Sequence, residues 1–419
     1  MVKPNHIAVI NVFFPPYSYG GATLVASEVA RELQRSHDCR ITAISGMDQP
    51  DMAPYAVMRS QVDGIDSYLI NLPRHRSYTE RYEGTRVAEI TAGLLKRIAP
   101  DLVHMHCLQE LGAGLIDVVQ AQGLPSVLSI HDFWWICERQ FMMRPNGQYC
   151  GQDPVDINAC GSCVSNLDRA RTRLGRLYNA ATKVDLVTFP SRFAQDLTLS
   201  SGLSPRQSVV WENGVQGPGP GFFAAQAARR AADQRLVFGY VGGPSTVKGW
   251  PLLRDAFAGL GRDDFAGLLV DASLKGTWWE GQRIGRMRGD WRLHPRYDIE
   301  SMDAFYAKID VLLFPSQWKE TFGLTVREAA TRGIRVIQTD AGGASEWTGA
   351  PLAEMLQIGD GPDALRRHIR AALETPKAHP QPLAMPGFAD QATTLIEAIS
   401  LLCTQLPSGR LNESVVGGT

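Results

Sequence analysis

The sequence predicts an α/β protein of two domains, each built around a parallel β-sheet. Its 419 residues are enough for two hydrophobic cores of ordinary size. Short β-rich runs alternate with longer amphipathic runs, as expected for repeated β-α-β units. A stretch of glycine and proline at residues 216–221 separates two groups of such units, and this composition is typical of a loop or linker.

The expected strands are short apolar runs, several of them followed directly by a turn signal. They lie at residues 7–12, 41–45, 102–106, 126–130 and 186–189, and then at 236–241, 267–270, 311–314 and 335–339. Helical patterns between them include residues 22–33, 88–98, 302–308 and 363–373, and a last apolar helix is expected at about 390–406. The polar tail, residues 407–419, is expected to be disordered.

The composition excludes several classes of protein. The chain is 44% hydrophobic and 20% charged with a formal net charge of -1, which is typical of a globular protein and argues against a general nucleic-acid binder. No stretch is long and apolar enough to span a membrane, so membrane contact would be peripheral. The apolar run at residues 7–14 lacks a cleavage-site pattern, and we expect a cytoplasmic protein, with contact at the inner membrane face left open.

Two carboxylates, Glu320 and Glu328, flank a glycine turn that opens a short helix at about Leu324. Unpaired N–H groups at such a helix start, around Gly323 to Thr325, suit a diphosphate. Glu320 can accept hydrogen bonds from sugar hydroxyls, and Glu328 from a ribose diol. Taken singly, Glu320 is better interpreted as a solvated loop charge, and Glu328 as a carboxylate that complements the helix dipole.

Further glycine turns follow the first strand of each predicted domain. Gly20 and Gly21 precede a helix, although such a pair is also found in ordinary tight turns. Gly242 and Gly243 follow the strand at 236–241, and Lys248 comes shortly after. A lysine ammonium can stabilise the negative charge on a departing diphosphate, whereas the alternative is an exposed lysine without a role.

Histidines and one tyrosine complete the candidate polar residues. His131 ends the strand 126–130 at the carboxyl edge of the sheet, where its ring can hydrogen-bond a sugar hydroxyl. His104 and His106 are expected to face opposite sides of their strand and to be structural. Tyr297, in the loop before the helix at 302–308, is a candidate contact for a nucleotide base.

Four of the seven cysteines lie close together in the sequence, at Cys137, Cys150, Cys160 and Cys163. Four converging thiolates could hold a structural Zn²⁺, and Cys160 and Cys163 have the Cys-x₂-Cys spacing of a ligand pair. An iron–sulfur cluster or four unconnected thiols remain alternatives. A four-ligand site would leave no open coordination position, so no catalytic metal is expected.

The stretch from Glu320 to Glu328 resembles the E-x₇-E motif of retaining glycosyltransferases with the GT-B fold, in the family that includes sucrose synthase and phosphatidylinositol mannosyltransferase. The resemblance implies two Rossmann-like domains whose parallel sheets face an interdomain cleft. It places the N-terminal domain at 1–205, joined by the returning helix at about 390–406, and the C-terminal domain at 206–389. Residues 208–215 resemble the strand and turn that begin the family's second domain.

The resemblance also assigns roles to individual residues. The catalytic residues that it implies are Glu320, Lys248 and His131. The donor-binding residues are Gly20, Gly21, Gly242, Gly243, Lys248, Tyr297, Glu320, Phe322, Gly323, Leu324, Thr325 and Glu328. The family commonly has an arginine five residues before the lysine, and this chain has Gly243 there.

The function implied is transfer of a sugar, with retention, from a nucleotide diphosphate donor to a hydroxyl of a saccharide or lipid-linked saccharide, in bacterial polysaccharide or glycoconjugate synthesis. A GT-B sugar-nucleotide epimerase and a noncatalytic sugar-nucleotide binder are the alternatives. A nicotinamide dehydrogenase is disfavoured because no G-x-G-x-x-G follows a strand. The arginines at 169–176 read as a solvated face, or else as a contact for anionic lipid or a pyrophosphate-linked acceptor.

Overall fold

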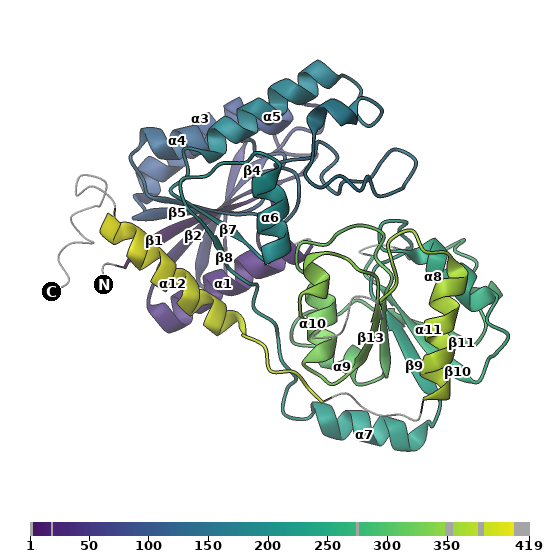
Figure 1. Cartoon of the computed structure of the whole chain (residues 1–419). Helices are drawn as coiled ribbons and strands as arrows, with labels where there is room; N and C mark the ends of the chain where they lie inside the picture. The colour runs from purple at the N-terminus through teal and green to yellow at the C-terminus, as the bar shows by residue number, and fades with distance from the viewer. Residues whose placement is uncertain (1–2, 18–19, 274–275, 348–354, 376–380, 406–419) are drawn as a thin grey trace. The chain divides into compact units, whose positions relative to one another are not determined.

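A computed structural model describes residues 3–17, 20–273, 276–347, 355–375 and 381–405 of the chain. The chain divides into two compact units (Figure 1). The first comprises residues 1–140, 152–214 and 386–419, and the second comprises 141–151 and 215–385. The expected boundary at 205–206 therefore falls inside the first unit. The tail expected at 407–419 lies outside the described residues.

The first unit contains an eight-stranded sheet in the order β3-β4-β2-β1-β5-β6-β7-β8. Its strands are β1 His6–Asn11, β2 Arg40–Met47, β3 Val57–Val62, β4 Ile65–Asn71, β5 Leu102–Met105, β6 Ser126–Ser129, β7 Leu186–Phe189 and β8 Ser208–Val210. All neighbours are parallel except β3 and β4, which are antiparallel. Strands β1, β5, β6 and β7 are buried along their whole length, which explains why apolar residues stand at consecutive positions in each of them.

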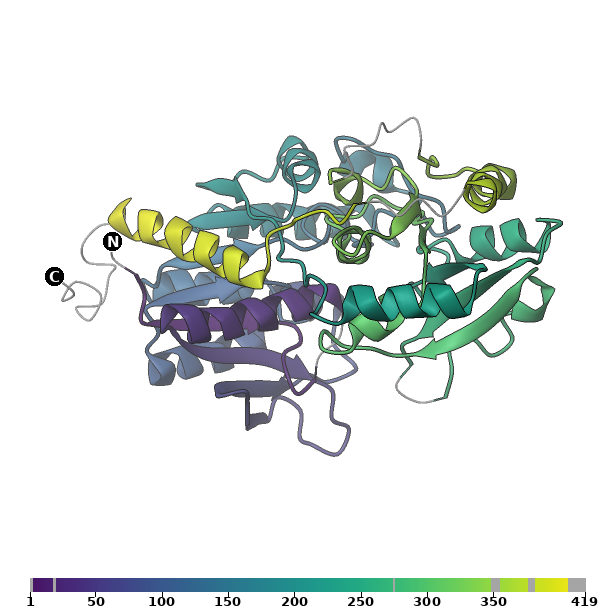
Figure 2. The same ribbon diagram turned by 90° about the horizontal axis from the view of Figure 1, so that it is seen from below.

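The helices of the first unit are α1 Gly21–His37, α2 Tyr78–Glu83, α3 Thr85–Ile98, α4 Gly114–Ala121, α5 Leu167–Ala181, α6 Arg192–Ser200 and α12 Phe388–Gln405, with a 3₁₀ turn, η1, at Ile157–Cys160. Helix α12 lies beside α1, as both ribbon views show (Figures 1 and 2). The indole N–H of Trp211 donates to the carbonyl of Gln391 at 3.0 Å, and the backbone N–H of Gly214 donates to the Gln391 side chain at 2.7 Å. The last helix is thus fastened to the segment that leaves the first sheet.

The second unit contains a five-stranded parallel sheet in the order β11-β10-β9-β12-β13. Its strands are β9 Leu236–Tyr240, β10 Phe265–Asp271, β11 Asp290–Pro295, β12 Val311–Phe314 and β13 Arg335–Gln338. Its helices are α7 Phe222–Ala232, α8 Trp250–Ala258, α9 Met302–Tyr306, α10 Leu324–Ala330 and α11 Pro362–Glu374, with 3₁₀ turns η2 Ile284–Arg286 and η3 Gly343–Ser345.

Each sheet has a point at which the direction of strand addition reverses. In the first unit β2 and β5 lie on opposite sides of β1, and in the second unit β10 and β12 lie on opposite sides of β9. Loops at the carboxyl ends of the two central strands diverge at such a switch point and leave a crevice for ligands. The topology therefore selects the loops after β1 and β5, and those after β9 and β12, as the candidate binding loops.

Four strands differ from the sequence-based expectations. The hairpin β3–β4 was missed, although its turn residues Asp63 and Gly64 both have positive φ and form the Asp-Gly pair favoured in tight hairpins. Strand β8 does not begin the second unit, because Ser208 to Val210 pair with Val187 to Phe189 and complete the first sheet. Strand β11 was missed because it is an edge strand with exposed polar residues and lacks an apolar run.

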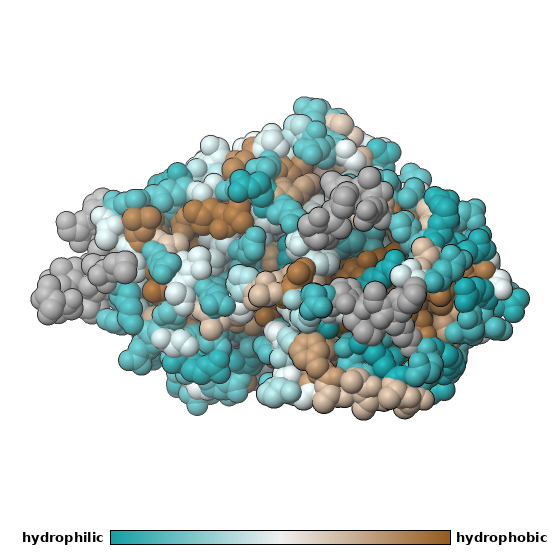
Figure 3. All heavy atoms as spheres, turned by 60° about the horizontal axis from the view of Figure 1, so that its bottom comes forward, coloured by the Kyte–Doolittle hydropathy of each residue, from teal (hydrophilic) through white to brown (hydrophobic). Residues whose placement is uncertain are grey.

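Helix α7 has its charged side chains turned inward. Arg229 and Arg230 both bind Asp310, at 2.7 and 2.9 Å, and the backbone N–H of Val237 donates to the same carboxylate at 2.9 Å. The outer face of the helix consists of alanines and Phe223, which is seen as a pale brown strip in Figure 3. Burial alone raises the pKa of Asp310, but the hydrogen bonds and charge of Arg229, with the Val237 and Arg230 donors, outweigh it and lower the pKa.

We predict that Asp310→Asn lowers the free energy of unfolding by about 3 kcal/mol at pH 7, because it leaves two largely buried guanidinium groups without a carboxylate. The folded-state pKa of Asp310 is lower than its unfolded value, so the wild-type advantage is full above about pH 4 and shrinks as the pH falls through the folded-state pKa. Urea unfolding of both proteins at pH 7 and pH 3 measures this difference. A larger difference in the free energy of unfolding at pH 3 than at pH 7 would contradict a lowered folded-state pKa for Asp310.

Candidate functional site

Lys248 and Glu320 meet at the carboxyl ends of β9 and β12. The Lys248 ammonium donates to Oε1 of Glu320 at 2.7 Å, and the same oxygen accepts from Ser316 Oγ at 2.8 Å and from Trp318 Nε1 at 2.9 Å. Glu320 is only 7% exposed, so these three donors offset the cost of burying its charge. No donor among the described residues reaches Oε2, which leaves that oxygen available to a ligand hydroxyl.

The backbone of Glu320 is fixed on both sides. Its N–H donates to the carbonyl of Ala341 at 2.9 Å, and its carbonyl accepts from the N–H of Gly343 at 2.9 Å. These bonds form a short parallel bridge to the loop that follows β13. The carboxylate is therefore presented from a rigid backbone, although it lies in a loop.

Gly249 explains how the lysine and the glutamate come together. This residue has a φ of 79°, and a Cβ placed on it would lie 1.9 Å from the carbonyl oxygen of Pro315. Only glycine allows such a close approach of the loops after β9 and β12. Gly249 directly follows Lys248 in the sequence, and its constraint was not recognised from the sequence.

A tryptophan packs beside Gly243, where the family commonly has an arginine. Gly243 has a φ of 62°, and a Cβ placed on it would lie 2.8 Å from Cε3 of Trp278. Gly242 is also closely packed, because its Cβ position lies 2.9 Å from Cβ of Lys248. The indole of Trp278, 38% exposed, thus occupies the space that a side chain at position 243 would need.

Glu328 lies on α10 and is buried against tyrosines. The Tyr306 hydroxyl donates to Oε2 of Glu328 at 2.7 Å. Burial raises the pKa of Glu328, while the Tyr306 hydroxyl and the charge of Arg332 act in the opposite direction. The Tyr297 ring stacks on Phe305, with centroids 5.3 Å apart, and burial raises the pKa of its phenol. Sequence reasoning named Glu328 and Tyr297 but missed Tyr306, which was hidden within an apolar helix pattern.

Glycines and small residues surround the start of α10. The helix begins at Leu324, and its N-cap residue, Gly323, has a φ of 78°. A Cβ on Gly323 would lie 2.6 Å from Cβ of Ala344, so the glycine permits contact with the turn after β13. The Phe322 ring lies 3.7 Å from the guanidinium carbon of Arg327, and Phe322 is buried. Phe322 therefore packs the loop, while Thr325 is half-buried.

His131, which is half-buried, pairs with the buried His106 in the first unit. A hydrogen bond of 2.9 Å joins Nε2 of His131 to Nδ1 of His106. Burial lowers the pKa of His131 to about 4 and that of His104 to about 3, so both rings are neutral at pH 7. The expectation that His104 and His106 face opposite sides is wrong. Their ring centroids lie 4.0 Å apart, because residues two apart along a strand share a face.

Gly20 and Gly21 stand at the start of α1. Gly20 has a φ of 82° as the N-cap residue, and Gly21 is the first residue of the helix. Asn11, which sequence reasoning missed, ends β1 and accepts from the backbone N–H of Cys107 at 3.0 Å. Its amide nitrogen also donates to the Phe13 carbonyl at 2.8 Å. Asn11 thus ties the loop after β1 to the loop after β5.

The cysteines do not assemble into a metal site in the described part of the chain. None of the seven forms a disulfide. Among the described residues, no three side chains of His, Cys, Asp or Glu come together as a metal-binding group. Cys137, Cys160 and Cys163 belong to the first unit, whereas Cys150 belongs to the second. The four-thiolate zinc site stays a prediction from the sequence.

The arginines of α5 do not form one solvated basic face. Arg173 is buried and donates to the carbonyl of Trp134 at 2.7 Å. Arg176 binds the carboxylates of Glu83 and Asp117. These two side chains point into the first unit, where they connect α5 to its neighbours. Within the described ranges, no helix has the length and apolar character needed to cross a membrane.

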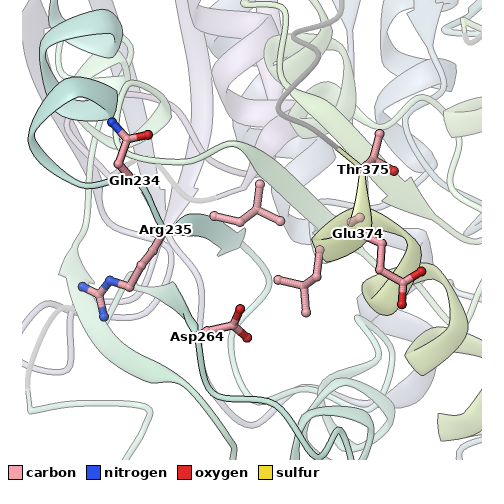
Figure 4. Close-up of a pocket in the computed structure, with 8 residues that line it drawn as sticks. Gln234, Arg235, Asp264, Glu374 and Thr375 are labelled. Atoms are coloured by element: carbon pink, nitrogen blue, oxygen red, sulfur yellow. The ribbon is translucent and has the colours of Figure 1, made fainter.

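A separate pocket of about 320 Å³ lies at the other edge of the second sheet. It is lined by Gln234, Arg235 and Leu236 at the start of β9, by Asp264 just before β10, and by residues 372–375 at the end of α11. Figure 4 shows Arg235 and Asp264 on one side of it and Glu374 and Thr375 on the other, with the charged ends of Arg235 and Glu374 directed away from each other. Because it lies at the amino ends of the strands, it is distinct from the loops that carry Lys248 and Glu320.

Comparisons with known proteins agree with the fold and with the motifs. The sequence profile of Glycosyltransferase Family 4 matches residues 19–217, and that of Glycosyl transferases group 1 matches residues 288–382. Together the two matches cover more than half of the chain. No curated protein sequence matches the chain.

Solved structures share the fold over nearly the whole chain. Sucrose-phosphate synthase from Thermosynechococcus elongatus has a TM-score of 0.63 at 16% identity, covering 96% of this chain and 97% of its own. The Anabaena protein HepE in complex with UDP and glucose has a TM-score of 0.60 at 17% identity, covering 96% and 99%. A UDP-forming trehalose-phosphate synthase from Burkholderia xenovorans, in complex with glucose-6-phosphate, has a TM-score of 0.64 at 13% identity, covering 94% and 100%.

Two doubly wound units with these profile matches define a glycosyltransferase of the GT-B class. The chain belongs to the retaining, family 4-like group of these enzymes, which act on nucleotide sugars. The expected fold class and enzyme class are therefore confirmed.

We predict that Gly243→Ala lowers the free energy of unfolding by about 1–2 kcal/mol, because alanine is strained at this positive φ and its Cβ meets Trp278. Urea unfolding of the single variants and of Gly243→Ala/Trp278→Ala separates the two causes. The steric part should be smaller when Trp278 is absent, so the two substitutions should not be additive. A Gly243→Ala protein as stable as wild type would contradict the described conformation.

Proposed function

We propose that this enzyme transfers a hexose from a UDP-sugar to a hydroxyl of a saccharide or lipid-linked saccharide, in polysaccharide or glycoconjugate synthesis. The observation that carries the proposal is the contact between Lys248 and Glu320 at the switch point of the second sheet. A cation for a diphosphate and an acceptor for sugar hydroxyls lie side by side there. The UDP complex of a protein with the same fold supports the choice of nucleotide.

When the donor binds, Lys248 would contact its diphosphate and Glu320 its sugar. Lys248 is about one third exposed, so its flexible stem can carry the ammonium from Glu320 to a diphosphate oxygen. Glu320 keeps the Ser316 and Trp318 donors on Oε1 when Lys248 leaves. Its Oε2 then accepts from a hexose hydroxyl. The negative charge that accumulates on the departing diphosphate is stabilised by Lys248.

Glu328 and His131 would bind parts of the substrates that do not react. Glu328 is oriented by Tyr306 and accepts from the hydroxyls of the nucleotide ribose. Tyr297 lies in the same aromatic cluster and is the candidate contact for the base. His131 is neutral at pH 7, so its ring can donate to or accept from a sugar hydroxyl without a change of charge.

The proposed reaction retains the configuration of the sugar without a protein nucleophile. The acceptor oxygen attacks the anomeric carbon from the side on which the diphosphate leaves. The bond from that carbon to the phosphate oxygen breaks, and a leaving-group oxygen takes the acceptor proton. The protein contributes positioning and charge stabilisation through an oxocarbenium-like transition state.

Two alternatives make different products. An epimerase of this fold needs only the sugar nucleotide, so incubation with the donor alone would yield an isomerised nucleotide sugar. A noncatalytic binder, which the glycine at position 243 makes worth testing, would bind nucleotide but give no product with any donor and acceptor pair. Calorimetry with UDP, GDP, ADP and TDP sugars identifies the donor, and proton NMR of the product reports its anomeric configuration.

We predict that Glu320→Gln and Lys248→Ala each lower kcat about 100-fold or more, because each removes charge aimed at the reacting part of the donor. Both proteins should stay folded. Lys308→Ala and Glu300→Gln remove the same charges from exposed or loop positions of the second unit and should leave transfer unchanged. The readouts are initial rates of nucleotide release and circular dichroism. Transfer at the wild-type rate by both site variants would refute the mechanism.

A further inference from the structure

Residues 141–151 form a hairpin that belongs to the second unit, although they lie in sequence between β6 and α5 of the first. The N–H of Arg144 donates to the carbonyl of Gln148 at 2.7 Å, and the N–H of Cys150 donates to the carbonyl of Met142 at 2.8 Å. Met142 and Met143 are buried. The hairpin is therefore a packed part of the second unit.

The hairpin lies beside the loop that carries Lys248 and contacts Trp318 in the loop that carries Glu320. A Cβ placed on Gly147 would lie 3.5 Å from Cγ2 of Thr246, in the loop that carries Lys248. The Phe141 ring meets the Trp318 ring edge to face, with centroids 5.0 Å apart and an interplanar angle of 79°. Phe141 is 38% exposed, so it does not belong to the hydrophobic core.

Trp318 connects Phe141 to the proposed catalytic pair. It is only 4% exposed, and its indole N–H donates to Oε1 of Glu320 at 2.9 Å. The Lys248 ammonium lies 5.6 Å from the centre of its ring. An edge-to-face contact of the observed kind fixes the plane of the indole and hence the direction of its N–H. Rotation of the indole would remove one of the three donors on Oε1 and change where Oε2 points.

The chain that leads into the hairpin is anchored within the first unit. Gln140, the residue before the hairpin, donates from its amide to Oδ2 of Asp132 at 2.7 Å, and the N–H of Trp134 donates to Oδ1 at 2.8 Å. Asp132 directly follows His131 in the sequence.

We propose that Phe141 is a positioning residue for Glu320. It holds the Trp318 indole so that the N–H stays on Oε1 and Oε2 stays directed at the donor sugar. The inference rests on the proposed function of Glu320, but the packing that it describes can be measured separately. It assigns the hairpin to the donor side of the reaction, a role that its position in the sequence does not suggest.

The test replaces Phe141 and measures both the turnover number and the environment of the Trp318 indole. Phe141→Ala should lower kcat about tenfold with little change in the KM of the donor, because the carboxylate is misplaced and donor binding is kept. Phe141→Tyr keeps the ring edge and should restore kcat, whereas Phe141→Leu keeps most of the volume and should not. Phe223→Ala, which removes a 48% exposed phenylalanine from α7, is the matched control and should leave kcat unchanged.

Fluorine NMR of protein labelled with 5-fluorotryptophan gives the independent readout. The Trp318 resonance is assigned as the one lost in Trp318→Phe, and it should shift or broaden in Phe141→Ala and Phe141→Leu but not in Phe223→Ala. A wild-type kcat and an unmoved resonance in Phe141→Ala would overturn the inference, while a low kcat for Glu320→Gln would keep the proposed function. A fully active Glu320→Gln would overturn both.

Discussion

The structure of the site depends on placing a buried glutamate and a lysine at the ends of two adjacent parallel strands. Glu320 is buried, and such a carboxylate is stable only when its charge is paired and hydrogen-bonded. Lys248, Ser316 and Trp318 meet this requirement on one oxygen and leave the other for a ligand. The lysine can move to a diphosphate without leaving the carboxylate unsupported, because two neutral donors stay in place.

This arrangement requires two loops to approach each other closely at the backbone. Gly249 makes the approach possible, since any side chain there would collide with the Pro315 carbonyl. The order of the strands supplies the rest, because β9 and β12 are neighbours at the switch point although 70 residues separate Tyr240 from Val311 in the chain. The position of Gly249 can be seen in the local sequence, but its contact with the Pro315 loop depends on the order of the strands.

Much of the fold and part of the site could be predicted from the sequence, because features set by neighbouring residues can be recognised in it. Buried parallel strands such as Leu186–Phe189 are short runs rich in apolar residues and were placed correctly, whereas the edge strand Asp290–Pro295 carries more polar residues and was missed. Lys248 and Glu320 stood out because charges beside glycines follow apolar strands. Tyr306 and Trp318 could not be identified in this way, since their roles depend on contacts between segments that periodicity does not connect.

The measurement that tests the central claim most directly is a crystal structure of the enzyme with an unreactive UDP-hexose analogue. The account predicts that the Lys248 ammonium leaves Glu320 and binds a diphosphate oxygen, and that Oε2 of Glu320 lies within about 3 Å of a hexose hydroxyl. It would be contradicted if the nucleotide bound elsewhere, for example in the pocket beside Arg235, while Lys248 and Glu320 stayed paired.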